Sequence, residues 1–103
     1  MHMTMFSREG FRQDAMWVYY NGKFVARFKY QKSAIGSFIK FIRNNFSVEE
    51  YFSRLDGGET PLAIVESKGY IHPNIRRMLR QRGYDDNAEG YAQYRFDMNR
   101  KST

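Results

Sequence analysis

The sequence predicts one small α+β domain in which an antiparallel sheet packs against three to four short helices. The chain has 103 residues, close to the size of a single domain, and dividing it would leave two cores too small to be stable. Hydrophobic residues make up 42% of the chain, which argues against an intrinsically disordered protein. A turn dipeptide, Asn21-Gly22, lies between two β-rich runs, and apolar residues at helical spacing follow from Ser33 onward.

Three segments are expected along the chain. Residues 1–14 form an N-terminal arm, residues 15–98 form the domain, and residues 99–103 form a C-terminal tail. The arm mixes glycine and charged residues with Phe6 and Phe11. This composition is compatible both with an arm that docks through the two rings and with a loose arm.

Residues 15–30 predict a β-hairpin, because Asn21 and Gly22 both tolerate the positive φ that a two-residue type I′ turn requires. Such a turn pairs Tyr20 with Lys23, Tyr19 with Phe24, Val18 with Val25, and Trp17 with Ala26. The face expected to join the core carries Trp17, Tyr19, Phe24, Ala26, Phe28 and Tyr30. The opposite face carries Met16, Val18, Tyr20, Lys23, Val25, Arg27 and Lys29. Its mixture of basic and apolar groups suits a nucleic-acid platform and equally suits a solvated sheet face.

The following residues predict two helices. Residues 33–46 have helical spacing, and the expected core positions are Ile35, Phe38, Ile39, Ile42 and Phe46. Ser47 and Glu50 have the form of a capping box that opens a short amphipathic helix, which Asp56-Gly57-Gly58 ends. Near the C-terminus, residues 91–98 alternate in polarity and are expected to add a strand to the hairpin, with one face made of Ala92, Tyr94, Phe96 and Met98.

Residues 58–88 predict a helix-loop-helix. Thr60 is a suitable N-cap, Pro61 fits the first helical position, and Gly69 can end the helix in a left-handed conformation. Pro73 begins a second helix in the same way, and Gly83 ends it.

The residues of this segment resemble one ankyrin repeat. The motifs that match are Gly58-Glu-Thr60-Pro61-Leu62, the central Gly69, Met78-Leu79-Arg-Gln-Arg-Gly83 and Tyr84-Asp85-Asp86-Asn87-Ala88. The family pattern is broken by two extra residues between Ile71 and Asn74, by the missing His after Leu62, and by Tyr84 and Asp86. The resemblance implies a helix pair of the kind that this family uses to bind proteins, and a single repeat implies no array.

Two other interpretations of the same residues stay open. In the first, the helix pair is a DNA-reading helix-turn-helix, with Arg76, Arg77, Arg80 and Arg82 on the second helix and residues 85–96 as a wing. In the second, residues 61–68 form a buried strand that ends in Glu66-Ser-Lys68, which resembles the active-site strand of the PD-(D/E)xK nucleases. That resemblance implies a metal held by Glu66 with Asp56 or Glu50, and Lys68 beside the attacking water, although the Pro-Asp dipeptide of the family is missing.

The charge of the chain is positive and segregated. Lys and Arg number 17 against 11 acids, which gives a formal charge of +6. No acid occurs between Asp14 and Glu49, and a second basic block runs from Lys68 to Arg82. We expect these cations to gather on one exposed surface. The candidate binding residues are Tyr20, Lys23, Arg27, Lys29, Lys40, Arg43, Arg76, Arg77, Arg80 and Arg82.

The expected function is that of a small basic non-enzymatic binding protein that contacts nucleic acid, either DNA or RNA, or a nucleoprotein complex. The alternative is a protein-protein interaction module or inhibitor that binds an acidic protein partner, for which a viral host-takeover protein is one compatible origin. No catalytic residue, metal site or cofactor is expected, because cysteine is absent and His2 and His72 are the only histidines. The lack of a long apolar run and of a signal peptide predicts a cytoplasmic protein with no membrane partner.

Overall fold

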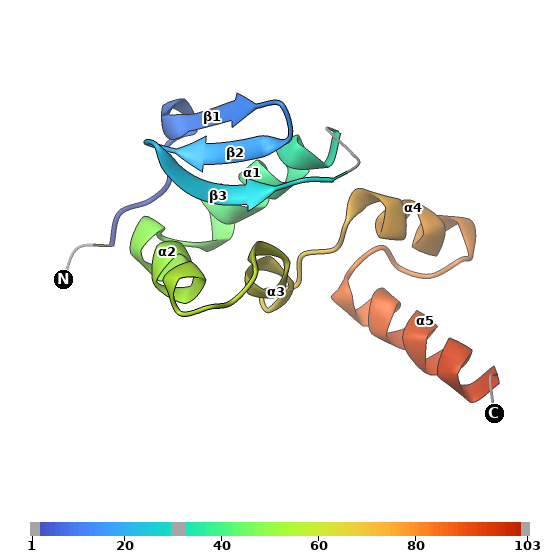
Figure 1. The fold of residues 1–103 in the computed structure, drawn as a ribbon. Helices are drawn as coiled ribbons and strands as arrows, with labels where there is room; N and C mark the ends of the chain where they lie inside the picture. Colours follow the sequence, from blue (N-terminus) through green and yellow to red (C-terminus); the bar gives the residue numbers. More distant parts are fainter. Residues whose placement is uncertain (1–2, 30–32, 102–103) are drawn as a thin grey trace. The chain divides into compact units, whose positions relative to one another are not determined.

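The computed structural model describes residues 3–29 and 33–101 and has an α+β fold with a three-stranded antiparallel sheet (Figure 1). Its elements are the 3-10 helix η1 (Arg8–Gly10), the strands β1 (Phe11–Asp14), β2 (Trp17–Tyr20) and β3 (Lys23–Arg27), and the helices α1 (Ser33–Asn45), α2 (Val48–Asp56), α3 (Pro61–Glu66), α4 (Pro73–Gln81) and α5 (Ala88–Lys101). The predicted fold class is confirmed. The chain divides into two compact units, Met1–Lys68 and Gly69–Thr103. None of the described helices is both long and apolar enough to cross a bilayer.

The predicted hairpin is present, with φ of 48° at Asn21 and 84° at Gly22. The third strand of the sheet is β1, which pairs with β2, so the order is β1-β2-β3. The prediction that residues 91–98 supply this strand is wrong, because they lie within helix α5. The arm expected at residues 1–14 contains a strand of the sheet instead.

A β-bulge changes the predicted register of the hairpin. Tyr20 pairs with Lys23 and Tyr19 with Phe24 as expected, but the register then shifts, so that Val18 pairs with Ala26 and Trp17 with Arg27. Strand β3 therefore contains one extra residue, and two consecutive side chains, Val25 and Ala26, are both buried. The residue after them, Arg27, is exposed and lies on the same face as Trp17.

The sheet buries the face that the sequence analysis placed in solvent. Val18, Tyr20 and Val25 are buried, whereas Trp17 and Phe24 are 40% and 39% exposed. The predicted assignment of the two faces is therefore wrong. The helices decide it: α1 lies behind the sheet in Figure 1, and the hydroxyl of Tyr51 in α2 donates a hydrogen bond of 2.6 Å to the carbonyl of Val25.

The core of the first unit combines the sheet with side chains from three helices. Four of the expected positions, Ile35, Phe38, Ile42 and Phe46, are buried as predicted, and Ile39 is half-buried. Further buried side chains are Tyr51, Phe52, Ile64 and Val65. The predicted N-caps form, since Ser47 accepts a hydrogen bond from the Glu50 amide and Thr60 accepts one from the Ala63 amide. The Glu50 carboxylate, expected to complete a capping box, lies 2.8 Å from the ammonium of Lys68 instead.

The N-terminal segment docks through Phe6, which is 6% exposed. Its ring lies 4.8 Å from that of Tyr20 and 6.0 Å from that of Tyr51, both edge-on. The Ser7 amide donates to the hydroxyl of Tyr20, and the Thr4 amide donates to the carboxylate of Glu49. These contacts favour the docked arm over the loose one.

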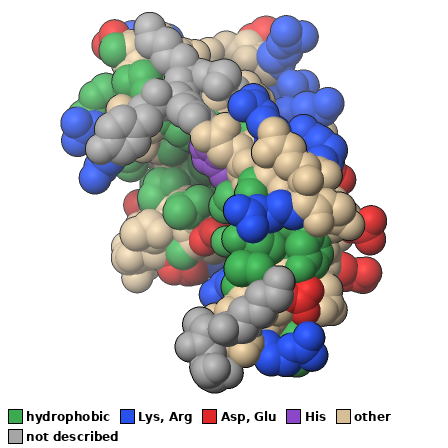
Figure 2. Space-filling model, turned by 90° about the vertical axis from the view of Figure 1, so that its right-hand side faces the viewer, with side chains coloured by type: hydrophobic (Ala, Val, Ile, Leu, Met, Phe, Trp, Pro, Cys, Tyr) green, Lys and Arg blue, Asp and Glu red, His purple; other side chains and the backbone are tan. Residues whose placement is uncertain are grey.

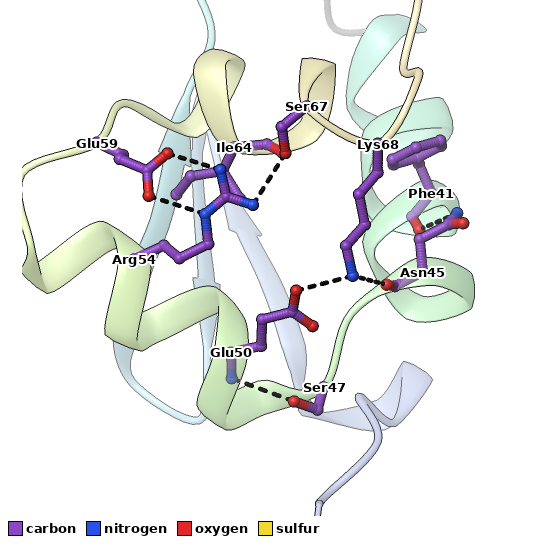
Figure 3. Close-up of polar contacts among 9 residues, drawn as sticks. All are labelled: Phe41, Asn45, Ser47, Glu50, Arg54, Glu59, Ile64, Ser67 and Lys68. Atoms are coloured by element: carbon purple, nitrogen blue, oxygen red, sulfur yellow. Dashed lines mark hydrogen bonds and ion pairs between the residues drawn. The ribbon is translucent and has the colours of Figure 1, made fainter.

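Polar contacts tie α1, α2 and α3 together (Figure 3). Arg54 in α2 donates to both carboxylate oxygens of Glu59 and to the hydroxyl of Ser67. Lys68 lies 2.8 Å from the Glu50 carboxylate and donates to the carbonyl of Asn45. A bidentate arginine and a lysine with two partners fix the path of the chain on both sides of α3.

The second unit contains α4 and α5. A side-chain cap at the first turn of α5 favours a helix over a strand for the residues that follow. The Asn87 side chain accepts a hydrogen bond of 2.8 Å from the Gly90 amide, which is an N-cap contact. Helical spacing groups the half-buried Tyr91 with Tyr94 and Met98, whereas the predicted strand face grouped Ala92 and Phe96 with Tyr94 and Met98. Phe96 is 61% exposed. The tail expected at residues 99–103 begins inside α5.

Replacing Tyr51 by Phe should destabilise the first unit. Burial raises the pKa of the Tyr51 hydroxyl. Removing this hydroxyl would leave the Val25 carbonyl without the hydrogen bond that Tyr51 donates. We expect a loss of about 1–2 kcal/mol in the free energy of unfolding, measured by urea denaturation. Tyr19→Phe is the control, because the Tyr19 hydroxyl makes no hydrogen bond with a described residue, and equal losses in both variants would contradict the assignment.

Two glycine substitutions in helices should have opposite effects. A Cβ at Gly90 would overlap the backbone carbonyl of Asp85, whereas a Cβ at Gly36 would meet no atom within 4 Å. Gly90→Ala should therefore lower the thermal unfolding midpoint, and Gly36→Ala should raise stability by up to about 1 kcal/mol, the difference in helix propensity. Unchanged stability in Gly90→Ala would show that the turn before α5 is not packed as described.

Candidate functional site

Five side chains define a candidate site on the exposed side of the sheet, which we call the outer face: Arg12, Trp17, Tyr19, Phe24 and Arg27. The strand register places them together. Arg12 pairs with Tyr19 across β1 and β2, while Tyr19 pairs with Phe24 and Trp17 with Arg27 across β2 and β3. Directly paired residues of an antiparallel sheet project to the same face.

Aromatic rings and guanidinium groups alternate on the outer face. Arg12 Cζ lies 5.2 Å from the centre of the Tyr19 ring, and Arg27 Cζ lies 5.1 Å from that of Trp17. The rings of Trp17 and Phe24 meet edge-on, with their centres 5.7 Å apart. Each arginine is therefore held over a ring by a cation-π contact while remaining exposed to solvent.

The two arginines of the outer face form no ion pair with a described residue. One acid shares their side of the sheet, because Asp14 pairs with Trp17 in the β1-β2 register. Beside the outer face, a hollow of about 320 Å³ is lined by Trp17, Arg27, Phe28 and Lys29. The region consequently combines apolar surface with an excess of positive charge.

The structure distributes the predicted hairpin residues differently from expectation. Arg27 belongs to the outer face and Lys29 lies beside it. Tyr20 is buried and accepts a hydrogen bond from Ser7, so its place on an exposed binding face was predicted wrongly. Lys23 pairs with Tyr20, and its Nζ lies over the ring of Phe52 rather than on the outer face.

Four residues of the outer face were missed by the sequence reasoning. Trp17, Tyr19 and Phe24 were assigned to the core because the aromatic-rich face of the hairpin was taken as the buried one, and Arg12 was missed because residues 1–14 were taken as an arm. Residues 12–14 are all polar and lack the alternation of apolar and polar side chains that is typical of a strand, so the local pattern contains no strand signal for Arg12.

The other predicted cations lie elsewhere. Lys40 and Arg43 belong to α1 and line a second hollow with Arg8. In the second unit, Asp86 binds Arg80 at 2.7 Å and Arg76 at 3.3 Å, and Arg82 lies over the ring of Tyr94. Arg77 is exposed and has no ion pair with a described residue.

The residues expected to form a single basic surface come from both units. The face drawn in Figure 2 carries Lys and Arg side chains together with acidic and hydrophobic ones. Pairing with acids consumes part of the charge, since Arg54, Lys68, Arg76 and Arg80 all bind carboxylates.

The strand expected by the nuclease interpretation is absent, because residues 61–66 form helix α3. A helix does not present Glu66 and Lys68 with the geometry of that family's strand. Lys68 binds Glu50 instead, which had been considered as a metal ligand (Figure 3). Within the described residues, no three His, Cys, Asp or Glu side chains are placed to hold a metal ion.

The wing of the helix-turn-helix interpretation is also wrong, because most of residues 85–96 lie in α5. Both helices of the predicted helix-loop-helix are present, as α3 and α4, and Gly69 and Gly83 have the left-handed φ expected of helix ends. The resemblance to an ankyrin repeat stays a prediction. No protein-family model, curated protein or solved structure matches the chain.

Acid should weaken the ion pairs of the second unit. The hydrogen bond from Arg80, and then the charges of Arg76 and Arg80, hold the pKa of Asp86 below its ordinary value. Because the folded pKa is the lower one, the stabilisation is complete above the unfolded pKa of about 3.9 and is lost as the pH falls through the folded value. An NMR titration of the Asp86 carboxyl should show the low midpoint.

Arg80→Gln should move that midpoint upward, whereas Arg77→Gln should leave it in place, because Arg77 makes no contact with Asp86. A wild-type midpoint at or above the ordinary value would contradict the pairing.

Proposed function

We propose that the protein binds single-stranded nucleic acid on the outer face of its sheet. The observation that carries the proposal is the alternation of aromatic rings and unpaired arginines on neighbouring strands. Non-specific single-strand binding proteins combine two such groups, aromatic rings on which bases stack and cations that follow the phosphate backbone.

The chemistry of the outer face matches the two parts of a nucleotide. Trp17 and Phe24 stay about two-fifths exposed although apolar burial would favour covering them, so their rings are available for stacking. A base that stacks on Trp17 or Tyr19 takes the place of the guanidinium above the ring, and the displaced arginine then meets a phosphate. Bases paired inside a duplex do not offer their faces in this way, which favours single strands.

The positive charge of the whole chain supports the same ligand. A formal charge of +6 attracts a polyanion over distances longer than any single contact. The outer face contains no amide or carboxylate pair directed at base edges, so we expect weak sequence preference. Binding then depends on stacking and on the release of counterions.

Titration with single-stranded oligonucleotides at two ionic strengths tests the proposal. Affinity should fall steeply with salt, and quenching of the fluorescence of Trp17, the only tryptophan, should report binding directly. Trp17→Ala or Phe24→Ala should weaken binding by about 5- to 100-fold, the equivalent of one stacked base. For these variants, binding is followed by the anisotropy of a labelled oligonucleotide.

The matched control is Phe96→Ala, which removes an even more exposed ring from the second unit. It should leave the affinity unchanged. Asp14→Asn should tighten binding and Arg12→Gln should weaken it, because both alter the charge of the outer face alone. Absence of binding at low salt, or equal affinities for Trp17→Ala and the wild type, would reject the proposal.

A protein partner is the second candidate, because Trp, Tyr and Arg are also the residues enriched at the energetic centres of protein interfaces. The partner would be acidic and would cover the same five residues. A pull-down from nuclease-treated lysate separates the candidates. A defined protein that stays bound after nucleic acid is destroyed, and is lost with Trp17→Ala, would favour this alternative.

A further inference from the structure

A second hollow of the first unit, which we call the basic groove, has a volume of about 710 Å³. It is lined by η1, β1 and α1, and its cations are Arg8, Lys40 and Arg43. Its volume falls in the range of about 300–1,000 Å³ that is typical of small-molecule sites. The groove is distinct from the outer face, because the β1 residues that line it, Phe11 and Gln13, are the neighbours of Arg12 in the strand and project to the opposite side of the sheet.

The lining of the basic groove has positive charge without an acid to balance it. No carboxylate lines the groove, and Arg8, Lys40 and Arg43 form no ion pair with a described residue. The other cations of the first unit that border α3 are paired, as Arg54 and Lys68 show. Three like charges around one hollow repel one another, and a bound anion would relieve that repulsion.

Arg43 gives the groove a second, independent feature. Its side chain is half-buried, and its Nε is buried without a hydrogen-bond acceptor among the described residues. A buried donor without an acceptor is unfavourable, and native proteins usually supply one from protein, solvent or ligand. Arg43 is therefore partly buried at the groove without an ion pair to an acid in the described part of the chain.

We propose that the basic groove binds a compact phosphate group. Guanidinium forks match the oxygens of phosphate, and the ammonium of Lys40 supplies a point charge. The side chain of Asn44 adds an amide donor to the lining, and that of Gln13 adds the second hydrogen of an amide that already donates to the Ala15 carbonyl. Phe11 and Ile39 add apolar walls that strengthen each polar contact by excluding water. The phosphate could belong to a free small molecule or to the 5′ end of a nucleic-acid strand, and the chemistry is the same in both.

Inorganic pyrophosphate is the probe for the first test, titrated into the full chain at fixed low ionic strength and followed by calorimetry. We expect saturable binding at one site. Arg8→Gln and Lys40→Gln should each weaken it about tenfold, the loss expected for one charge-assisted hydrogen bond. Arg43→Gln should do the same, and its thermal unfolding midpoint shows whether the half-buried position still folds.

The controls remove equal charge elsewhere, with Lys29→Gln beside the outer face and Arg77→Gln in the second unit. Both should bind pyrophosphate as the wild type does. Equal weakening in the controls, or no saturable binding at low ionic strength, would overturn the proposal, because attraction would then follow net charge alone.

The source of the phosphate is decided by comparing oligonucleotides with and without a 5′-phosphate. Tighter binding of the phosphorylated strand that disappears in Lys40→Gln would support the groove and assign it to a strand end. Equal binding of both strands, with pyrophosphate binding intact, would support a free small phosphate ligand. Trp17→Ala should leave pyrophosphate affinity unchanged, so the proposal for the basic groove and the proposal for the outer face are tested independently of each other.

Discussion

One extra residue in β3 organises the first unit of this protein. The bulge buries two consecutive side chains, Val25 and Ala26, and places Arg27 beside Trp17 on the opposite side of the sheet. The Val25 carbonyl accepts a hydrogen bond from the hydroxyl of the buried Tyr51 in α2, so the bulge residue also anchors this helix. Core and candidate site are therefore two consequences of one backbone feature, as is common for bulges near functional surfaces.

The aromatic residues of the first unit divide into a buried set and an exposed set. Phe6, Tyr20 and Tyr51 are buried and pack edge-on within the core. Trp17 and Phe24 sit on the other side of the sheet and keep two-fifths of their surface exposed. A stable fold does not require apolar rings at exposed positions, and their combination with unpaired arginines is what favours a ligand with stacking faces and negative charge.

The cations divide in the same manner. Arg54 and Lys68 bind carboxylates and fasten helices to one another, and Arg80 does the same within the second unit. Arg12 and Arg27, in contrast, lie over aromatic rings and form no ion pair with a described acid. Net positive charge thus does not locate a polyanion site by itself. The cations that pair with carboxylates must first be distinguished from those that form no ion pair.

Local signals in the sequence determined the Asn21-Gly22 turn, the caps at Ser47 and Thr60, and the buried positions of α1, because each depends on residues within a few positions of one another. Contacts between distant segments decided the rest. The alternation of residues 91–98 is compatible with a strand, but they are helical, and the ring of Tyr94 packs against that of Tyr84 outside the helix. The Asn87 cap of this helix is a local signal that the alternation outweighed in the prediction. The helices that cover the sheet decided which face is buried, and the bulge decided that Ala26 lies on that face and Arg27 on the other, and neither is encoded in the spacing of one strand.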